Sequence, residues 1–185
     1  MKETRTTEKT RHREVKVAKV VVAVGLGKAR QKDAHFEDKV LPDLVRELAA
    51  ITGQLPRVTK AKKSIAGFKV RQGESVGLQV TLRGARMRDF LAKVLRIALP
   101  RVRDFRGIRQ TSIDGEGNLS IGFRDQMVFP EVNPETSKVN FGLQVTIVPN
   151  RNPGSGAVDF YRGEGVPWGT VESAPSRGKK RQGSS

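Results

Sequence analysis

The chain has no cysteine, which excludes disulfide bonds, thiolate metal sites and thiol nucleophiles. Histidine is almost as scarce, since His12 and His35 are the only two and lie far apart in the sequence. The acidic residues form no larger cluster, and the pair Asp114 and Glu116 lies in a turn where an Asp usually bonds to nearby backbone. No catalytic triad pattern and no Walker loop occurs. We therefore expect no catalytic residues, no metal site and no cofactor.

Long hydrophobic runs are also missing. No stretch of 18 apolar residues could cross a bilayer. A membrane surface is the weaker candidate for a basic partner site, because it normally requires a basic amphipathic helix that presents Trp or Phe to the bilayer. The first residues, MKETRTTEKTRHRE, contain no apolar core of a secretory signal. The sequence therefore predicts a cytoplasmic protein with no membrane partner.

Positive charge is the property the chain has in excess. Its 35 Lys and Arg against 19 Asp and Glu give a net charge of +16 over 185 residues, with a pI of about 10.8. Most of that excess lies in residues 54–109, where 15 basic residues face three acidic ones, a net charge of +12. Such a concentrated field favours binding to a polyanion, and nucleic acid is the first candidate.

The hydrophobic pattern divides the chain into four parts. Residues 1–14 are polar and cannot bury enough surface to order themselves, so they are expected to form a disordered tail. Residues 15–149 carry regular patterns and should fold as one α+β RNA-binding domain. Residues 150–169 are expected to be irregular, and residues 170–185 form a basic tail that is expected to be disordered.

Within 15–149, alternation predicts strands at 15–24, 76–82, 119–123 and 141–147, while helical spacing predicts helices over 40–51 and 87–98. Pro42 should either kink the first helix or begin a second one, and Pro100 should stop the other. Residues 58–70 read as an extended basic segment. Gly73 then predicts a hairpin with Arg71 and Glu74 near its tip.

This order of elements predicts an antiparallel or mixed sheet with helices packed on one face. The other face would be polar and free to meet RNA. Its side chains would be Lys19, Gln79, Thr81, Arg83, Ser120, Arg124, Gln144 and Thr146.

A nucleotide-binding enzyme is the main competing interpretation. The stretch VVVAVGLGKAR places Gly25 and Gly27 after a valine-rich strand, as in the start of a dinucleotide-binding fold. The third glycine of that fingerprint would fall at Arg30, whose long side chain obstructs close packing of a helix on a strand. No second βαβ unit follows, so an ordinary pair of glycines at a strand end is favoured.

Two clusters of cations are better explained by phosphate contacts. One lies on the extended segment, where Lys60 and Lys62 should project to the same side. The other crowds the loop after Pro100. The two clusters comprise Lys60, Lys62, Lys63, Lys69 and Arg71, and Arg101, Arg103 and Arg106. By contrast, cations on a helix face are usually only solvated.

The scarcity of aromatic residues bears on the form of the nucleic acid. Single-strand binders stack bases on aromatic platforms, but most of the eight Phe residues read as core. These are Phe68, Phe90, Phe123, Phe129 and Phe141. Recognition should therefore go through the backbone and shape of a folded RNA. Double-stranded DNA is disfavoured because no groove-reading motif occurs.

Several stretches, in order, resemble the bacterial large-subunit ribosomal protein L5 family. They are VVVAVGLGKA, ITGQLPRVTKAKKSIAGFKVRQGESVG, VTLRGARM, ALPRVRDFRG and DGEGNLSIGFRDQMVFPE, and the similarity runs over residues 15–148. The family's closing helix is echoed only by VDFYRGEGVPWG, which Gly163 and Gly165 interrupt.

The resemblance implies a non-enzymatic protein that binds 5S rRNA in the central protuberance. It also implies contact with the elbow of peptidyl-site tRNA and a bridge to the small-subunit head protein S13. Further implied partners are large-subunit rRNA and the neighbouring 5S-binding ribosomal proteins. A free RNA-binding assembly or regulatory factor remains the alternative.

The expected site residues combine the cationic clusters with positions carried over from the resemblance. The residues expected to bind rRNA are Lys19, Gly25, Gly27, Lys60, Lys62, Lys63, Ser64, Lys69, Arg83, Arg101, Arg103 and Arg106. The residues expected to form the tRNA-contacting loop are Arg71, Gln72, Gly73, Glu74, Ser75 and Val76.

Overall fold

The computed structural model describes residues 14–32, 36–68, 70–135, 137 and 139–169. Its central strand is β1 (Val17–Gly25), in which Val20, Val22 and Val24 are buried while the residues between them are not. This alternation follows from the pleat of a strand, which sends successive side chains to opposite faces of a sheet. One face of β1 therefore lies in the core and the other remains accessible.

Four further strands complete the sheet: β2 (Arg57–Lys60), β3 (Ser75–Leu82), β4 (Leu119–Phe123) and β5 (Leu143–Pro149). Their order is β2-β3-β1-β5-β4, and every neighbouring pair is antiparallel. The predicted α+β class with an antiparallel sheet is confirmed. The dinucleotide-binding interpretation fails here, because that fold needs parallel strands joined by crossover helices.

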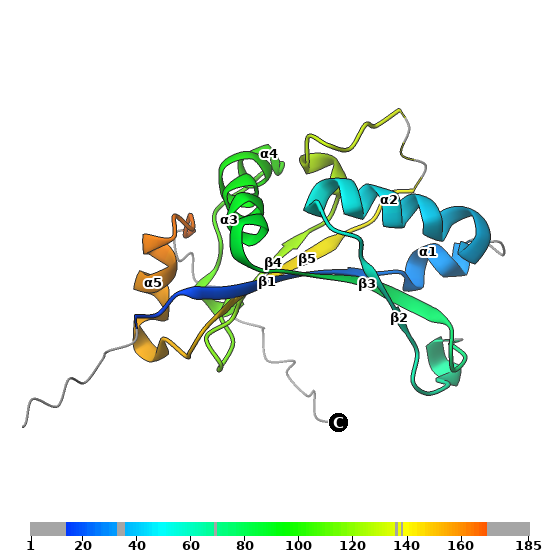
Figure 1. Cartoon of the computed structure of the whole chain (residues 1–185), viewed down its shortest axis with the longest axis horizontal. Coiled ribbons are helices and arrows are strands. Elements are labelled where there is room, and N and C mark those ends of the chain that lie inside the picture. The colour runs from blue at the N-terminus through cyan, green and yellow to red at the C-terminus, as the bar shows by residue number, and fades with distance from the viewer. Residues whose placement is uncertain (1–13, 33–35, 69, 136, 138, 170–185) are drawn as a thin grey trace, which may run out of the picture.

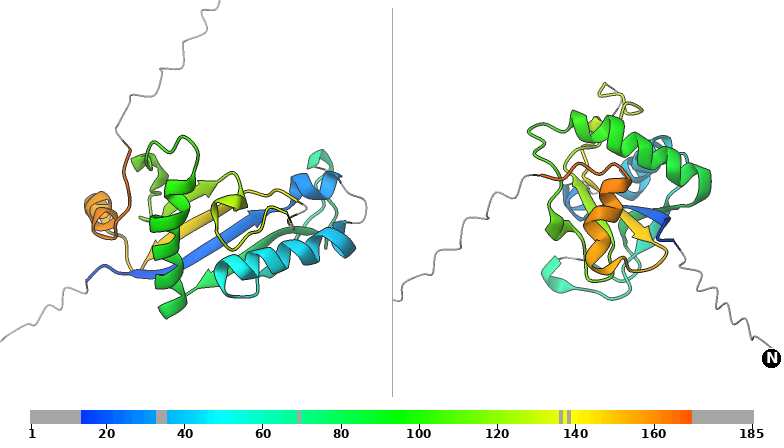
Figure 2. Two further views of the ribbon diagram at one scale, coloured as in Figure 1. Left: turned by 90° about the horizontal axis from the view of Figure 1, so that it is seen from above. Right: turned by 90° about the vertical axis from the view of Figure 1, so that its left-hand side faces the viewer.

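Helices cover one face of this sheet, as predicted (Figure 1). The longest are α2 (Leu41–Thr52) and α3 (Gly84–Lys93), and the shorter ones are α1 (Gly27–Lys32), α4 (Leu99–Arg101) and α5 (Ala157–Gly163). The helices bury Leu44, Leu48, Phe90 and Val94 against the valines of β1 and the apolar residues of β3 and β5. The opposite face carries no helix among the described residues (Figure 2).

Single turns of other helical types connect these elements. Wide π turns occur at η1 (Phe36–Val40) and η3 (Val94–Ala98). The 3₁₀ turns are η2 (Ala66–Phe68), η4 (Gln110–Ser112), η5 (Gln126–Val128) and η6 (Gly154–Gly156).

The two prolines inside helical patterns behave alike. Pro42 lies in the first turn of α2, directly after η1. It therefore begins a second helical segment, which is one of the two alternatives predicted from the sequence. The prediction that Pro100 stops its helix is wrong, because α4 runs to Arg101. The π turn before it lets the Leu99 N–H bond to the carbonyl of Val94, so Pro100 again occupies a first turn.

The prediction of an irregular segment over residues 150–169 is wrong for α5. The helix forms because Ala157 and Tyr161, four positions apart, are both buried. Gly163 and Gly165 do not break it but end it, and Gly165 takes a positive φ of 88° just after the last turn. The two tails expected to be disordered, apart from Glu14, lie outside the described residues.

Candidate nucleic-acid interface

The β2–β3 loop (residues 61–74) is held by its own backbone at two levels. At its base the Ala61 N–H donates to the carbonyl of Glu74 at 2.8 Å, and the Gly73 N–H donates to the carbonyl of Ala61 at 2.9 Å. Farther out, Ile65 and Val70 form an isolated antiparallel bridge that closes a second, smaller hairpin. The loop is therefore an ordered projection from the sheet.

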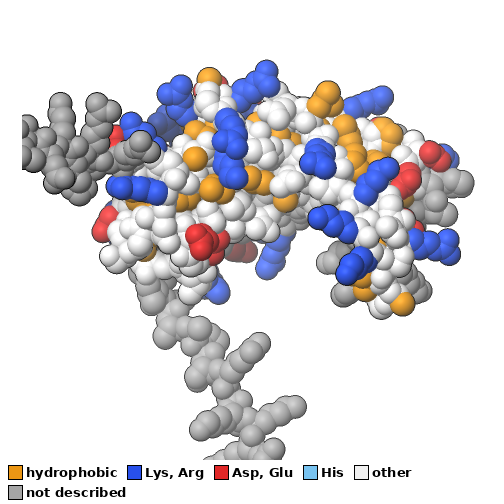
Figure 3. Space-filling model, turned by 60° about the horizontal axis from the view of Figure 1, so that its bottom comes forward, with side chains coloured by type: hydrophobic (Ala, Val, Ile, Leu, Met, Phe, Trp, Pro, Cys, Tyr) orange, Lys and Arg blue, Asp and Glu red, His pale blue; other side chains and the backbone are white. Residues whose placement is uncertain are grey.

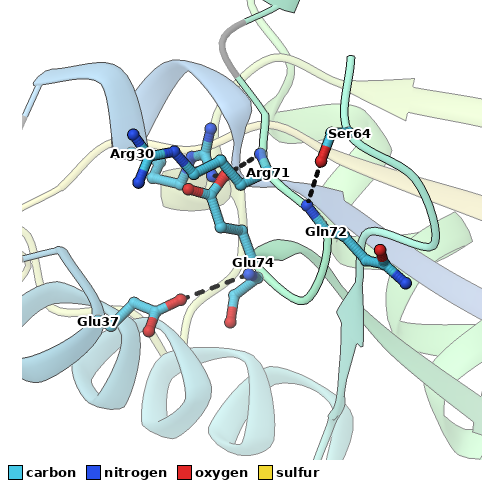
Figure 4. Close-up of polar contacts among 7 residues, drawn as sticks. Arg30, Glu37, Ser64, Arg71, Gln72 and Glu74 are labelled. Carbon is cyan, nitrogen blue, oxygen red and sulfur yellow. Dashed lines mark hydrogen bonds and ion pairs between the residues drawn. The ribbon is translucent and has the colours of Figure 1, made fainter. Parts of the chain in front are cut away.

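Glu74 fastens this loop to α1 (Figure 4). Its carboxylate forms an ion pair with the Arg30 guanidinium and accepts the backbone N–H of Arg71 at 2.7 Å. The Arg30 side chain is only 14% exposed, so the pair is partly shielded from water. From η1, the Glu37 carboxylate accepts the Ser75 N–H at 3.4 Å. Arg30, the residue whose long side chain argued against a nucleotide-binding turn, thus supports the cationic β2–β3 loop.

The predicted hairpin is confirmed by the pairing of β2 with β3, but its details differ. The strand ends at Lys60, after a register shift, so the predicted row of Lys60 and Lys62 on an extended segment is wrong. The placement of Arg71 and Glu74 near the tip is also wrong, since both lie toward the base. The reason is the bridge between Ile65 and Val70, which a search for alternating residues did not predict.

Lys60, Lys62 and Lys63 are all exposed, and none forms an ion pair with a described acidic residue. Glu74, the acidic residue within the loop, is already bound to Arg30. The ammonium groups are consequently not neutralised by the described fold. Ser64 is exposed beside them, and its hydroxyl oxygen accepts the Gln72 N–H at 3.0 Å.

The face of the sheet away from the helices carries polar, basic and small hydrophobic side chains (Figure 3). Gln79, Ala23 and Gln144 are aligned across β3, β1 and β5, and the paired residues Thr81, Val21 and Thr146 form the next row. Basic side chains are spread over this face, while acidic side chains gather toward its two ends (Figure 3). Ala23 and Gly25 of β1 are exposed on this face.

The second cationic cluster lines a groove at the other edge of the sheet. Residues 101–109, which begin at the last residue of α4, face residues 120–125 of β4 and its end across a space of about 1140 Å³. The groove contains exposed arginines from both sides. They are Arg101, Arg103, Arg106, Arg109 and Arg124.

The structure brings some of the predicted RNA-binding residues together and separates others. Gly25 pairs with Gly77, which pairs with Thr59, so Gly25 and the following Gly27 lie near the base of the β2–β3 loop. Lys19 and Arg83 lie beyond the pair of Val20 and Leu82, at the opposite end of these strands. Lys69 lies outside the described residues.

The predicted tRNA-contacting residues differ in accessibility. Arg71, Gln72 and Gly73 are exposed, whereas Ser75 is only 4% exposed and Val76 is half-buried. Sequence reasoning also missed two candidates. Ile65, half exposed at the outer hairpin, stands in a run of exposed residues, and Phe105 lies in the arginine groove. The signal for Phe105 was available, because Arg103 and Arg106 flank it in the sequence.

Asp114 illustrates an acidic residue with a structural role. Its carboxylate accepts the Glu116 and Asn118 N–H groups at 3.0 and 2.8 Å and the Asn118 side-chain amide at 2.9 Å. These bonds, led by the one from the Asn118 side chain, lower the pKa of Asp114 below its usual 3.8. Among the described residues, no group of three or more His, Cys, Asp or Glu could hold a metal ion. No helix of the described part is long and apolar enough to cross a bilayer.

A cationic α+β protein with a braced basic loop and an arginine-lined groove has the features of a nucleic-acid-binding protein. Family models agree with this class. The model described as ribosomal protein L5 matches residues 11–71, and the model for the C-terminus of the same ribosomal family matches residues 75–168.

Several proteins are similar to this chain along most of their own length. The chain is 45% identical to the large ribosomal subunit protein uL5 of Carboxydothermus hydrogenoformans over 153 residues, 83% of each chain. It is 45% identical to the protein of that name from Synechococcus sp. over 157 residues, 85% of each chain. The protein of that name from Aster yellows witches'-broom phytoplasma is 46% identical over 153 residues, 83% of this chain and 82% of the relative.

The chain belongs to the ribosomal protein L5 family. It is therefore a structural constituent of the large ribosomal subunit, with ribosomal RNA and ribosomal proteins as partners, and is not an enzyme.

Proposed function

We propose that the chain binds 5S rRNA in the central protuberance of the cytoplasmic ribosome, contacts peptidyl-site tRNA and contributes to the bridge with S13. The observation that carries this proposal is the β2–β3 loop. It presents Lys60, Lys62 and Lys63 on a braced backbone, with no described acidic residue to neutralise them. Phosphate oxygens of a folded RNA would supply the missing counter-charges.

The remaining rRNA contacts follow from the same face of the molecule. Gly25 and Gly27 lie near the base of the loop, where the absence of side chains lets a sugar-phosphate backbone come close. Lys19 and Arg83 extend the surface to the far end of the polar sheet face. Lys69 and Ser64 belong to the loop itself, and the groove arginines Arg101, Arg103 and Arg106 bind a further part of the rRNA.

The tRNA contact is assigned to the exposed part of the predicted loop, Arg71, Gln72 and Gly73. Glu74, Ser75 and Val76 support that part from beneath, since Glu74 is bound to Arg30 and Ser75 is buried. A tRNA elbow is a compact, folded RNA surface, and an ordered loop meets it with little loss of conformational entropy. The neighbouring 5S-binding proteins would meet other surfaces of the same particle.

Salt dependence tests the electrostatic basis of 5S rRNA binding. If about six phosphates are neutralised, the slope of log affinity against log salt should be about −4 to −5. Filter binding of the full chain to 5S rRNA over a range of KCl concentrations measures it. A slope near zero would contradict phosphate contacts as the source of affinity.

Replacement of Lys60, Lys62 and Lys63 by Ala tests the loop directly. We expect the affinity for 5S rRNA to fall by at least about tenfold at moderate salt, because three phosphate contacts are lost. The unfolding midpoint should not change, since the three side chains are exposed. Arg46→Ala is the control, because its exposed side chain lies on α2. Equal affinities for the triple variant and the wild type would remove the loop from the interface.

A further inference from the structure

Two glycines that are far apart in the sequence bring the arginine loop (residues 101–107) and the C-terminal segment (residues 166–169) into direct backbone contact. A Cβ built on Gly107 would lie 2.2 Å from the backbone nitrogen of Gly169, and a Cβ built on Gly169 would lie 2.5 Å from the carbonyl oxygen of Arg106. Neither position can therefore carry a side chain unless the backbone shifts. The two stretches meet along their main chains.

Hydrogen bonds hold the two backbones at this distance. The Ile108 N–H donates to the carbonyl of Pro167 at 2.8 Å, and the Gly169 N–H donates to the carbonyl of Ile108 at 3.0 Å. Ile108 and Trp168 thereby form an isolated parallel bridge. Because Ile108 is also buried, the C-terminal segment fixes the point at which the arginine loop ends.

The C-terminal segment is itself anchored by α5. The Val166 N–H donates to the carbonyl of Tyr161 at 3.0 Å, and the Val166 side chain is buried. The Tyr161 hydroxyl donates to the carbonyls of Gly117 and Ile147, so α5 is bonded to the sheet. A short pair of strands is only marginally stable alone. This bridge is supported by a helix and by the core.

The arginine loop has a conformation that needs such support. At its start the Val102 N–H donates to the carbonyl of Leu99 in α4 at 3.1 Å. Between that bond and Ile108, Asp104 has a φ of 55° and is the only residue other than glycine with positive φ in the described part of the chain. This conformation is unfavourable for a residue with a side chain, and it persists only where the surroundings impose it. If its second end were released, the loop would adopt other conformations.

Exposed cations lie on this loop. Arg101 and Arg103 are exposed and form no ion pair with a described acidic residue, and Arg106 is also exposed. Their mutual repulsion opposes any conformation that holds them close together. A loop fixed at both ends presents them in one arrangement, so an anionic partner binds with a smaller loss of conformational entropy.

We propose that residues 166–169 position the arginine loop for its contact with rRNA, acting through the backbone of the loop. This inference rests on the proposed RNA-binding function and adds a set of positioning residues to it. Gly169 leaves room for the loop, and Trp168 forms the bridge with Ile108. The β2–β3 loop does not depend on these residues, because it is closed by its own hydrogen bonds and fastened to α1 and η1.

Gly169→Ala in the full chain tests the positioning role without changing any residue of the arginine loop. The new methyl group would meet the Arg106 carbonyl and push the two backbones apart. Hydrogen exchange should rise at least about tenfold in residues 102–108 and stay unchanged in residues 61–74. Gly163→Ala is the matched control, since no atom lies within 4 Å of a Cβ there and its φ is not positive.

Chemical footprinting distinguishes positioning for RNA from a purely structural role. The probe is a mixture of 5S rRNA and large-subunit rRNA transcripts. In the wild type, this RNA should protect the arginine loop from phenylglyoxal and the lysines of the β2–β3 loop from acetic anhydride. In Gly169→Ala only the protection of the arginine loop should be lost. The slope of log affinity against log salt should become shallower by about 2 to 3, the share of three phosphate contacts.

Two variants of Trp168 give an independent test. The indole N–H is buried without a hydrogen-bond partner in the described structure, so the ring and not its N–H supports the bridge. Trp168→Phe keeps a ring and should retain the wild-type footprint. Trp168→Ala should release the arginine loop as Gly169→Ala does, and this pair answers the same question if Gly169→Ala does not fold.

The footprints separate failure of this inference from failure of the proposed function. Full protection of the arginine loop in Gly169→Ala and Trp168→Ala would overturn the inference, and so would unchanged hydrogen exchange in both variants. Loss of protection at both loops, with an unchanged unfolding midpoint in urea, would show that the C-terminal segment does not act on the arginine loop alone and would also overturn it. If RNA protected neither loop of the wild type, the proposed function itself would be contradicted.

Discussion

The two cationic loops of this chain lie toward opposite ends of the molecule and are held by different parts of it (Figures 1 and 2). The β2–β3 loop is closed by its own hydrogen bonds and fastened to α1 and η1, which precede it. The loop after α4 is fastened to residues 167–169, far along the chain. Two supports that share no residue should fail independently, so each loop can be disturbed while the other is kept.

The largest expected effect comes from Gly107→Ala. The new methyl group would meet the backbone of Gly169, and alanine is strained at the φ of 89°. We expect a loss of about 3 kcal/mol in the free energy of unfolding, measured by urea denaturation. The affinity for 5S rRNA supplied by the β2–β3 loop should persist.

Gly115→Ala is the matched control for that change. No atom lies within 4 Å of a Cβ at Gly115, and its φ is not positive, so the free energy of unfolding should change little. If Gly107→Ala were equally mild, the C-terminal segment would not constrain the loop as the hydrogen bonds indicate.

Glu74→Gln disturbs the other loop. The amide can still accept the Arg71 N–H but no longer neutralises Arg30, whose side chain is largely buried. A partly shielded ion pair lies between surface and buried pairs in strength, so we expect a loss of about 1–2 kcal/mol. Hydrogen exchange should increase in residues 61–74 and not in residues 101–109. Equal increases in both loops would contradict their independence.

Tyr161→Phe weakens the anchor of the C-terminal segment by a smaller amount. The buried hydroxyl donates to the carbonyls of Gly117 at 2.7 Å and Ile147 at 3.2 Å, and its loss should cost about 1 kcal/mol. Burial raises the pKa of Tyr161 to about 12, above its usual 10.0. The unfolded chain therefore ionises first, and the tyrosine's contribution to stability is present below pH 10 and lost as pH rises toward 12.

Urea titrations of both proteins between pH 8 and about 12 check this sign. The wild type should lose more stability than Tyr161→Phe over the range from pH 10 upward. If the free energy of unfolding fell equally for the two proteins above pH 10, the Tyr161 hydroxyl would be solvated in the native state.

Asp114→Ala should have the smallest effect, because the turn that the carboxylate organises is exposed. We expect a loss within about 1 kcal/mol. Since hydrogen bonds lower the folded pKa below 3.8, the wild-type advantage should be constant above about pH 4. It should shrink as the pH falls through the lowered pKa, which acid denaturation of both proteins measures. An advantage that grew toward low pH would refute this assignment.

Local patterns predicted the strands and helices well, because each depends on neighbours a few positions away. Val20, Val22 and Val24 alternate in the sequence and are buried in the sheet. The predictions that failed concern local conformations that are set by contacts between residues distant in the sequence. The Ile65–Val70 bridge places the tip of the β2–β3 loop between these two residues and not at Arg71 and Glu74. The burial of Tyr161 against β5 stabilises α5, although Gly163 was expected to interrupt that helix.

The same division applies to the candidate site. Charge density along the chain located both cationic loops, and the family motifs agreed. The groove was not predicted, because Phe105 and Arg124 come together only through the position of β4 at the sheet edge. The role of Arg30 was missed for the same reason, since its partner Glu74 lies far away in the sequence.

By itself, the order of amino acids determined the class of fold and the excess of positive charge, since these depend on composition and local periodicity. Its motifs, taken in order, carried the resemblance to a ribosomal family. The tertiary structure alone decided which cations stand without a neighbouring carboxylate and which arginines share one groove. Those properties depend on contacts between segments remote in sequence, and such contacts are set by how the sheet and its loops pack together.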